Sequence, residues 1–188
     1  NKISHGCILR KINSLRKKKN EKMVKISETI AHAGPVMKVA WSQPSFGPII
    51  VSCGFDKKVA LFKIDYNNKI EKIYEHELHD NCVKTLKFSK SNNKFYLISG
   101  CLSGNLVTCE YINKNMVTNK ILAHDFGVNA TDFLDEDSFV TCGNDNLIKI
   151  WSYDKENQKI KNDIILSDIE YITKDISCKD NKHFVSCG

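Results

Sequence analysis

The sequence predicts an all-β fold in which one four-stranded unit repeats along the chain. Three observations lead to this prediction. A histidine followed by a short turn and an apolar strand recurs at His32, His79 and His124, which are 47 and 45 residues apart. A second apolar strand, ending in a hydroxyl residue and a cysteine or glycine, follows each histidine by about twenty residues. No segment shows the apolar periodicity of a long amphipathic helix.

The first complete unit predicts all four strands of the repeat. Its apolar segments at strand spacing are Val36–Trp41, Ile49–Cys53, Val59–Ile64 and Ile70–Glu75. Polar turns such as Phe55–Lys58 separate these segments, as expected between short antiparallel strands. Trp41 ends the first strand, and we expect its side chain in the core.

The second and third units repeat the pattern. Their second strands are predicted at Tyr96–Cys101 and Phe139–Gly143, and their third strands at Leu106–Cys109 and Leu147–Trp151. A further copy of the second strand ends the sequence at Phe184–Gly188. Four strands and a period of about 45 residues are typical of a propeller blade. Because one blade cannot bury both of its faces, we expect the blades to pack side by side around an axis.

The eight cysteines do not follow a metal-binding pattern. No two are spaced as C-x2-C, and no group of cysteines and histidines has zinc-finger spacing. Cys53, Cys142 and Cys187 share one position of the repeat, and Cys101 lies one residue further along its unit. We therefore expect reduced thiols that pack as small apolar residues in a reducing compartment. Neither a metal nor another cofactor is predicted.

Polar residues also recur at fixed places in each unit. The third unit carries the complete set of His124, Thr141, Asp145 and Trp151. A buried imidazole needs partners for both ring nitrogens, and a carboxylate in a tight turn can accept one of its protons. Because an unpaired buried polar group costs about 1–3 kcal/mol, we expect this set to form a hydrogen-bonded network inside the blade.

The other units keep this set in part. The members in the first unit are His32, Ser52, Asp56 and Phe62, so only the indole donor is missing. The members in the second unit are His79, Ser99, Ser103 and Cys109, so the carboxylate and the aromatic ring are both missing. We expect the network of the second unit to be largely broken.

The same residue types form the triad of serine hydrolases, which makes an enzyme the alternative to a structural network. A catalytic site has no reason to recur once per repeat, whereas a structural network does. The sequence also lacks the G-x-S-x-G turn that exposes a nucleophile in many hydrolases. We therefore predict no enzymatic activity and no catalytic residue.

In the spacing of histidine, hydroxyl residue, aspartate and tryptophan, the sequence resembles the WD-repeat family. This resemblance implies a WD-repeat β-propeller with antiparallel four-stranded blades. The strings His32–Val59, Tyr74–Asp80, Ala123–Ala130 and Asp145–Trp151 are similar to one branch of that family. These are the small WD-repeat subunits shared by the outer COPII vesicle coat and the Y-shaped nuclear pore scaffold. The likeness covers residues 32–152 and is weaker on both sides.

That branch implies a non-catalytic scaffold in ER-to-Golgi transport and in the nuclear pore. Its members form an open six-bladed propeller, into which a large outer-coat subunit or a scaffold nucleoporin inserts an extra blade. The implied locations are the cytoplasmic face of the endoplasmic reticulum, COPII vesicles and the nuclear pore complex, with membrane association only through the coat. No partner-contact residue follows from the sequence. A sister nucleoporin propeller and a WD-repeat adaptor that binds modified or acidic peptides remain alternatives.

We expect residues 1–188 to form a single propeller with complete blades at 32–78, 79–123 and 124–166. Partial blades are expected at 1–31 and 167–188, with a turn at Ser4–Gly6 and a strand at Cys7–Ile12. About four blades of sequence predict an incomplete or open six-bladed propeller, and hence a piece of a longer chain. The alternative is that residues 1–31 close the last blade into a four-bladed ring.

The net charge of +6 comes mainly from lysine, since Arg10 and Arg16 are the only arginines. Arginine is the residue that grips guanine and phosphate with two hydrogen bonds, so we expect no direct contact with nucleic acid. The basic run Arg16–Lys19 fits a solvated loop, with an import signal or a contact for acidic partners as alternatives. Three histidines outside the repeated position are expected at the surface or in turns: His5, His76 and His183.

Overall fold

A computed structural model describes residues 5–11, 24–154 and 159–188 of the chain. These residues form sixteen strands and a single turn of 3-10 helix at Pro44–Phe46. Within the same ranges, no helix has the length and apolar character needed to cross a membrane. The basic run Arg16–Lys19 lies outside the described residues.

Twelve of the strands form three antiparallel sheets of four strands each. The first sheet consists of β3 (Val36–Trp41), β4 (Ile49–Gly54), β5 (Val59–Ile64) and β6 (Ile70–His76). The second consists of β7 (Val83–Phe88), β8 (Tyr96–Cys101), β9 (Asn105–Ile112) and β10 (Asn115–Leu122). The third consists of β11 (Val128–Phe133), β12 (Ser138–Gly143), β13 (Ile148–Asp154) and β14 (Lys159–Leu166). Strands adjacent in sequence are adjacent in each sheet, which confirms the predicted four-stranded units.

Two further sheets have two strands each. They consist of β1 (His5–Lys11) with β2 (Val24–His32), and of β15 (Asp175–Cys178) with β16 (Phe184–Cys187). The turn predicted at Ser4–Gly6 is wrong, because β1 already begins at His5, whose backbone pairs with His32. This pairing satisfies the backbone groups along one edge of each strand, up to the point where the chain enters the first four-stranded sheet.

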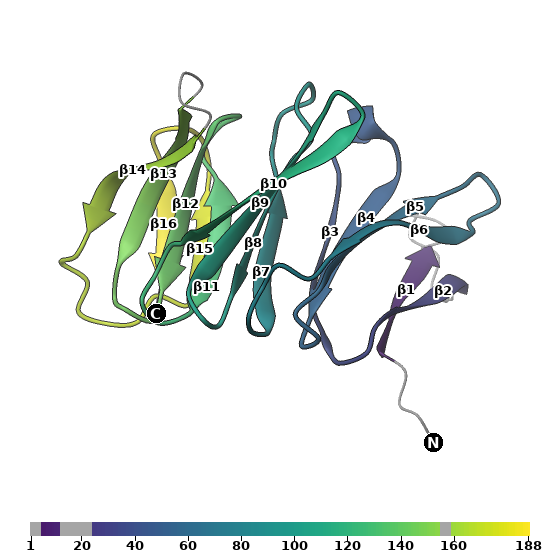
Figure 1. The fold of residues 1–188 in the computed structure, drawn as a ribbon, viewed down its shortest axis with the longest axis horizontal. Helices are drawn as coiled ribbons and strands as arrows, with labels where there is room; N and C mark the ends of the chain where they lie inside the picture. Colours follow the sequence, from purple (N-terminus) through teal and green to yellow (C-terminus); the bar gives the residue numbers. More distant parts are fainter. Residues whose placement is uncertain (1–4, 12–23, 155–158) are drawn as a thin grey trace, which may run out of the picture.

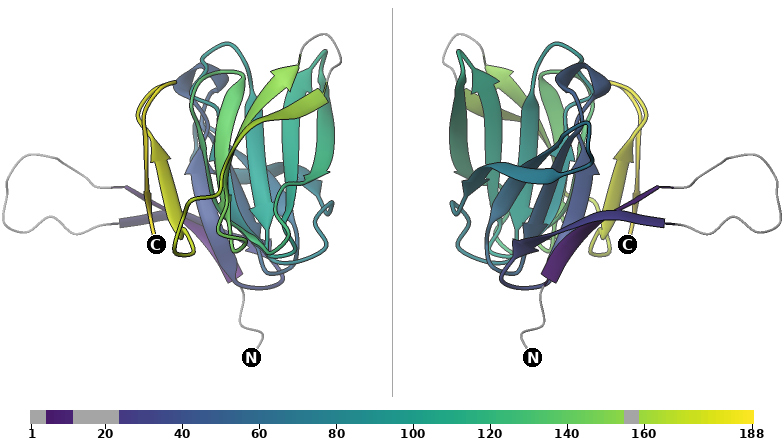
Figure 2. Two further views of the ribbon diagram at one scale, coloured as in Figure 1. Left: turned by 90° about the vertical axis from the view of Figure 1, so that its left-hand side faces the viewer. Right: turned by 90° about the vertical axis from the view of Figure 1, so that its right-hand side faces the viewer.

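The three four-stranded sheets lie side by side in sequence order, with β1–β2 beyond the first sheet and β15–β16 behind the third (Figure 1). In both views of Figure 2, β1–β2 and β15–β16 lie toward the same side of the molecule. Each of the last three sheets packs on the previous one through its first strand: β7 contacts β3 and β4, β11 contacts β7 and β8, and β15 contacts β11 and β12. The molecule is therefore an open propeller, and β1–β2 and β15–β16 are separate sheets that do not join into the last blade of a four-bladed ring.

The hydrophobic core lies between consecutive sheets. Val51 of β4 and Leu86 of β7 belong to one buried cluster shared by the first and second sheets. Between the second and third sheets, the rings of Tyr96 and Phe133 meet edge to face with centroids 5.6 Å apart. Each sheet thus buries its apolar face only by packing against its neighbour, as a propeller blade must.

The predicted core position of Trp41 is wrong, since this side chain is 54% exposed. Burial alternates along β3, as successive side chains of a strand point to opposite faces. Ala40 packs against the core shared with the second sheet, so Trp41 points to the opposite face. Met37 and Val39 are also exposed on this strand.

The tight turn between the second and third strands has the same backbone in all three complete sheets. The residue after the aspartate position has a positive φ each time: 67° at Lys57, 87° at Gly104 and 59° at Asn146. Glycine adopts this left-handed conformation without strain, and asparagine does so more readily than lysine. Lys57 therefore holds a strained backbone conformation that the turn geometry imposes.

Replacing Lys57 with glycine is expected to stabilise the protein by about 0.5–1 kcal/mol, because it removes this strain from an exposed turn. Urea denaturation followed by circular dichroism measures the change in the free energy of unfolding. The opposite substitution, Gly104→Ala, is the control, because an added Cβ would overlap the carbonyl oxygen of His124. A stabilised Gly104→Ala variant or a destabilised Lys57→Gly variant would contradict this account of the turn.

Candidate functional site

The third sheet holds the complete polar network. His124 lies between β10 and β11, and its Nδ1 is 2.8 Å and 3.0 Å from the two carboxylate oxygens of Asp145 in the β12–β13 turn. Its Nε2 is 2.8 Å from Oγ1 of Thr141 on β12. The indole Nε1–H of Trp151 on β13 donates to the same hydroxyl oxygen at 2.9 Å. One set of donors satisfies this geometry: indole to hydroxyl, hydroxyl to Nε2, and Nδ1–H to carboxylate.

Burial decides the charge state of this histidine. Because the side chain is desolvated, the pKa of His124 is lowered, although the neighbouring Asp145 carboxylate opposes the shift. The ring is therefore neutral at pH 7, in the tautomer that carries its proton on Nδ1. Asp145 also accepts backbone N–H bonds from Asp125 and Leu147, both at 3.2 Å. One carboxylate thus joins the inter-sheet connection to the tight turn.

The first sheet has the same arrangement without the indole. Nδ1 of His32 lies 2.8 Å from Oδ1 of Asp56, and its Nε2 lies 2.8 Å from Oγ of Ser52. The other carboxylate oxygen of Asp56 accepts the backbone N–H of Ala33 at 2.9 Å. Phe62 occupies the tryptophan position and is buried, so it packs but donates no hydrogen bond.

The second sheet keeps half of the network. Nε2 of His79 still lies 2.8 Å from Oγ of Ser99, although the sequence predicted that this network would be largely broken. Ser103, in the aspartate position, contacts Cys101 Sγ at 3.0 Å and Asn105 Nδ2 at 3.1 Å. Nδ1 of His79 is buried without a hydrogen-bond partner among the described residues.

The aromatic position also changes the strand pairing. The ladder between the third and fourth strands shifts register next to Phe62 in the first sheet and next to Trp151 in the third. In the second sheet, where Cys109 takes this position, β9 and β10 pair in regular register. The bulge therefore accompanies the large ring. Burial raises the pKa of the Cys109 thiol to about 12, so this cysteine is an inert packing residue.

The histidines outside the repeated position differ in their surroundings. His183 is exposed as predicted, and its ring Nδ1 contacts the carboxylate of Asp180 at 2.9 Å. The surface position predicted for His76 is wrong, because its side chain is only 7% exposed. It ends β6 beside the second sheet, with its ring centroid 6.0 Å from that of His79. For His5, the structure describes the backbone but not the side chain.

The geometry of Asp145, His124 and Thr141 matches the order of a hydrolase triad, but it cannot act on a substrate. The Thr141 side chain has no exposed surface, and its hydroxyl oxygen already accepts the indole N–H. Ser52 in the first sheet is equally inaccessible. In the described ranges, no three side chains of metal-ligating type come together. The hydrogen bonds of this arrangement connect the tight turn of a sheet to the strands beside it.

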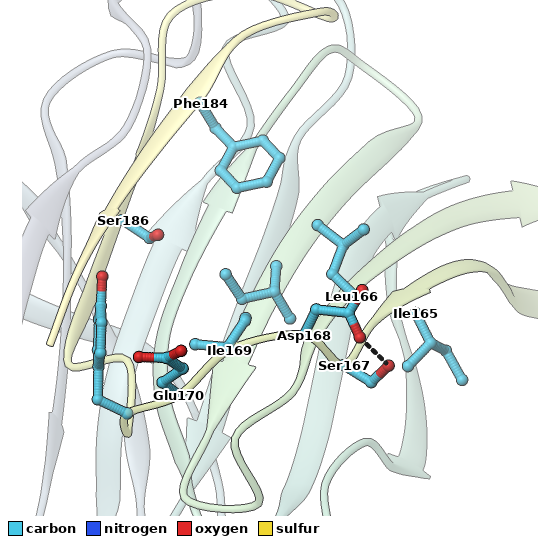
Figure 3. A pocket seen from close by; sticks show the side chains of 10 residues that line it. Ile165, Leu166, Ser167, Asp168, Ile169, Glu170, Phe184 and Ser186 are labelled. Carbon is cyan, nitrogen blue, oxygen red and sulfur yellow. Dashed lines mark hydrogen bonds between the residues drawn. The ribbon is translucent and has the colours of Figure 1, made fainter.

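A groove of about 570 Å³ lies between β13–β14 and β16 (Figure 3). Leu166 and Phe184 contribute apolar surface to it, while Asp168 and Glu170 contribute two carboxylates. Neither lysine nor arginine is among its lining residues. Its charge is therefore unsuited to an acidic peptide, which is one of the two kinds of ligand in the adaptor alternative.

The comparison with protein families agrees with the repeat. The family model described as "WD domain, G-beta repeat" matches residues 116–152, a range that includes β11, β12 and the whole network of the third sheet. Together with the open array of four-stranded sheets, this match shows that the chain is a WD40-repeat protein with a β-propeller fold.

Within the WD40-repeat proteins, the chain is similar to Sec13 proteins. It is 31% identical over 148 residues to protein transport protein SEC13-2 of Candida glabrata, covering 69% of this chain and 49% of the relative. It is 32% identical over 162 residues to the SEC13 homolog of Drosophila melanogaster, covering 74% and 44%. The SEC13 protein of Cryptococcus neoformans is 25% identical over 183 residues, covering 80% and 55%. The chain thus spans about half the length of the curated relatives it matches.

Removing the carboxylate of the third sheet by Asp145→Ser is expected to lower the free energy of unfolding by about 2–3 kcal/mol. The reason is that the buried Nδ1–H of His124 and two backbone N–H groups lose their acceptor together. Asp180→Ser is the matched control, because Asp180 contacts an imidazole in the same way but at the surface, where little change is expected. Denaturant titration of both variants measures the difference, and equal losses would contradict a buried network.

Substituting Trp151 with phenylalanine converts the third sheet to the arrangement of the first. We expect a smaller loss of about 1 kcal/mol, since the ring still packs and the hydroxyl of Thr141 loses only a donor. Thermal unfolding of Trp151→Phe and of Asp145→Ser under the same conditions measures which substitution destabilises the protein more. A loss larger than that of Asp145→Ser would show that the indole, rather than the carboxylate, maintains the network.

Proposed function

We propose that this chain is part of a non-catalytic scaffold subunit that works in vesicle-mediated protein transport. The observation that carries this proposal is the similarity of the chain to SEC13 proteins, of which those of Candida glabrata and Cryptococcus neoformans are named as protein transport proteins. The structure supports a scaffold rather than an enzyme, because the histidine, hydroxyl and carboxylate groups are hydrogen-bonded to one another inside the blades. The described surface then serves contacts with other proteins.

The finer proposal follows the resemblance of the sequence to subunits shared by two assemblies. The whole protein builds the outer COPII coat for transport from the endoplasmic reticulum to the Golgi, and it also joins the Y-shaped scaffold of the nuclear pore. A large coat subunit or nucleoporin supplies an extra blade to its open propeller. Blade insertion is chemically reasonable, since an edge strand offers unpaired N–H and C=O groups that an added strand satisfies.

This proposal places the protein at the cytoplasmic face of the endoplasmic reticulum, on COPII vesicles and at the nuclear pore. Its contact with membranes is indirect, through the coat, and it needs neither a cofactor nor direct binding to nucleic acid. The sister nucleoporin propeller would keep only the pore location. For the peptide-binding adaptor, the carboxylates Asp168 and Glu170 in the groove beside the third sheet would repel an acidic peptide, which leaves a modified peptide as the ligand of that alternative.

Affinity purification of the full-length protein, tagged in its own cells, tests the proposal. We expect a large partner to co-purify in a stoichiometric amount and to remain bound at high salt, because strand pairing and apolar packing are little screened by ions. Fluorescence of the same tagged protein is expected at sites on the endoplasmic reticulum and at the nuclear rim.

An unrelated soluble protein with the same tag is the control for both measurements. A full-length protein that purifies as a monomer, without a large partner, would contradict the scaffold proposal. A partner together with signal only at the nuclear rim would favour the sister nucleoporin propeller. Release of the bound partner by an acidic or modified peptide would favour the adaptor.

A further inference from the structure

Two buried imidazole nitrogens face the junction between the first and second sheets without a hydrogen-bond partner among the described residues. They are Nε2 of His76, at the end of β6, and Nδ1 of His79, before β7. The two side chains are 7% and 3% exposed, and their ring centroids lie 6.0 Å apart. Buried groups of this kind are rarely left unpaired, because each costs free energy when it is taken out of water.

The tautomer of His79 follows from its partner. The hydroxyl of Ser99 lies 3.3 Å from the carbonyl oxygen of Val107, to which it can donate its one proton. Oγ of Ser99 then accepts the Nε2–H of His79 across their 2.8 Å contact. This leaves Nδ1 of His79 as a bare acceptor. The arrangement is the reverse of His124, whose Nδ1–H donates to a carboxylate.

The tautomer of His76 follows in the same way. The backbone N–H of Leu78 points to Nδ1 of His76 at 3.4 Å, so Nδ1 is an acceptor and Nε2 carries the proton. The free donor of His76 and the free acceptor of His79 thus belong to rings whose centroids lie 6.0 Å apart. No hydrogen bond joins the two nitrogens directly, and a water molecule that accepts from one and donates to the other would satisfy both.

The position of His76 coincides with the loss of the carboxylate. The residue three places before the repeated histidine is Thr29 in the first unit and Ile121 in the third, and it is histidine only where Ser103 replaces aspartate. Ser103 cannot take the place of the carboxylate, because its hydroxyl is bonded to Cys101 and Asn105.

We propose that His76 replaces the missing carboxylate of the second blade. Its Nε2–H donates to a buried water, and that water donates to Nδ1 of His79. Because His76 belongs to β6 of the first sheet while His79 is bonded to β8 of the second, the bridge joins two blades. The site works only while both rings are neutral, so acid opens this junction.

Among the described residues, the carboxylates near the two rings are already paired with lysines, which weakens any stabilisation of the protonated rings. Asp80 lies beside His79, but its carboxylate is bonded to Lys120 at 2.8 Å and to Asn105. Glu75 and Glu77 flank His76 in the sequence, and both lie within salt-bridge distance of Lys58. On the remaining side, the neutral ring of Tyr74 lies 6.1 Å from His76.

Burial supports the neutral state on both rings. Desolvation lowers the pKa of His76 from 6.5 to about 4, and it lowers the pKa of His79 to about 3. A lowered pKa in the folded state means that the stabilisation is fully present above pH 6.5 and is lost as the pH falls below that value. Each of the two histidines then adds up to a tenfold increase in the unfolding constant per pH unit.

Nitrogen NMR of the histidine rings at pH 7.5 tests the proposal on the unmodified chain. We expect the proton of His79 on Nε2 and the protons of His32 and His124 on Nδ1. In Ser103→Asp, which restores the carboxylate, the proton of His79 is expected to move to Nδ1. An Nδ1–H tautomer of His79 in the unmodified chain would overturn the proposal.

The pH dependence of urea unfolding between pH 6.5 and 4.5 provides the second test. In the unmodified chain, the unfolding constant rises as the pH falls. In His76→Phe and in Ser103→Asp, this rise is expected to be smaller by a factor of up to ten per pH unit. His183→Asn is the matched control, because this histidine is exposed and its substitution should leave the acid dependence nearly unchanged. If His76→Phe behaves like His183→Asn, His76 is not the partner of His79.

Discussion

The fold depends on one constraint, which is that each ring nitrogen of a buried imidazole costs free energy when it is left without a hydrogen-bond partner. In the third sheet, the partners of His124 are a carboxylate in the β12–β13 turn and a hydroxyl on β12. The histidine itself lies on the connection that enters the sheet. Satisfying one ring therefore determines where the connection ends, how the turn closes and which hydroxyl faces inward. The repeat of this constraint sets the spacing of the sheets along the chain.

The sequence was sufficient to predict the strands because each unit carries its own pattern of apolar residues and turns. It was insufficient wherever burial depends on a neighbouring sheet. His76 lies outside the repeat and is buried only because the second sheet packs beside β6. Trp41 is a large apolar residue of the kind found in cores, but it points to the face of β3 that is away from the second sheet. The bond between His79 and Ser99 was underestimated because a histidine can reverse its tautomer.

The packing between sheets also explains why the reactive side chains of the described residues are buried. Cys53 and Cys142 occupy equivalent strand positions, and burial raises their thiol pKa values to about 12 and about 11. Their side chains fill the space between sheets, in the same way as the apolar residues around them. When the reactive groups of a blade are buried in its own packing, the groups that remain available to other proteins are the backbone edges and the surface side chains. That is the property a scaffold requires.

The second sheet shows which part of the network is essential. The donors of the third sheet run in one direction, from the indole of Trp151 through Thr141 and His124 to the carboxylate. The first sheet lacks the indole and keeps this direction, so the carboxylate sets the direction and the indole only adds to it. Without the carboxylate, the bond to Ser99 reverses, and the hydroxyl gives its proton to the backbone.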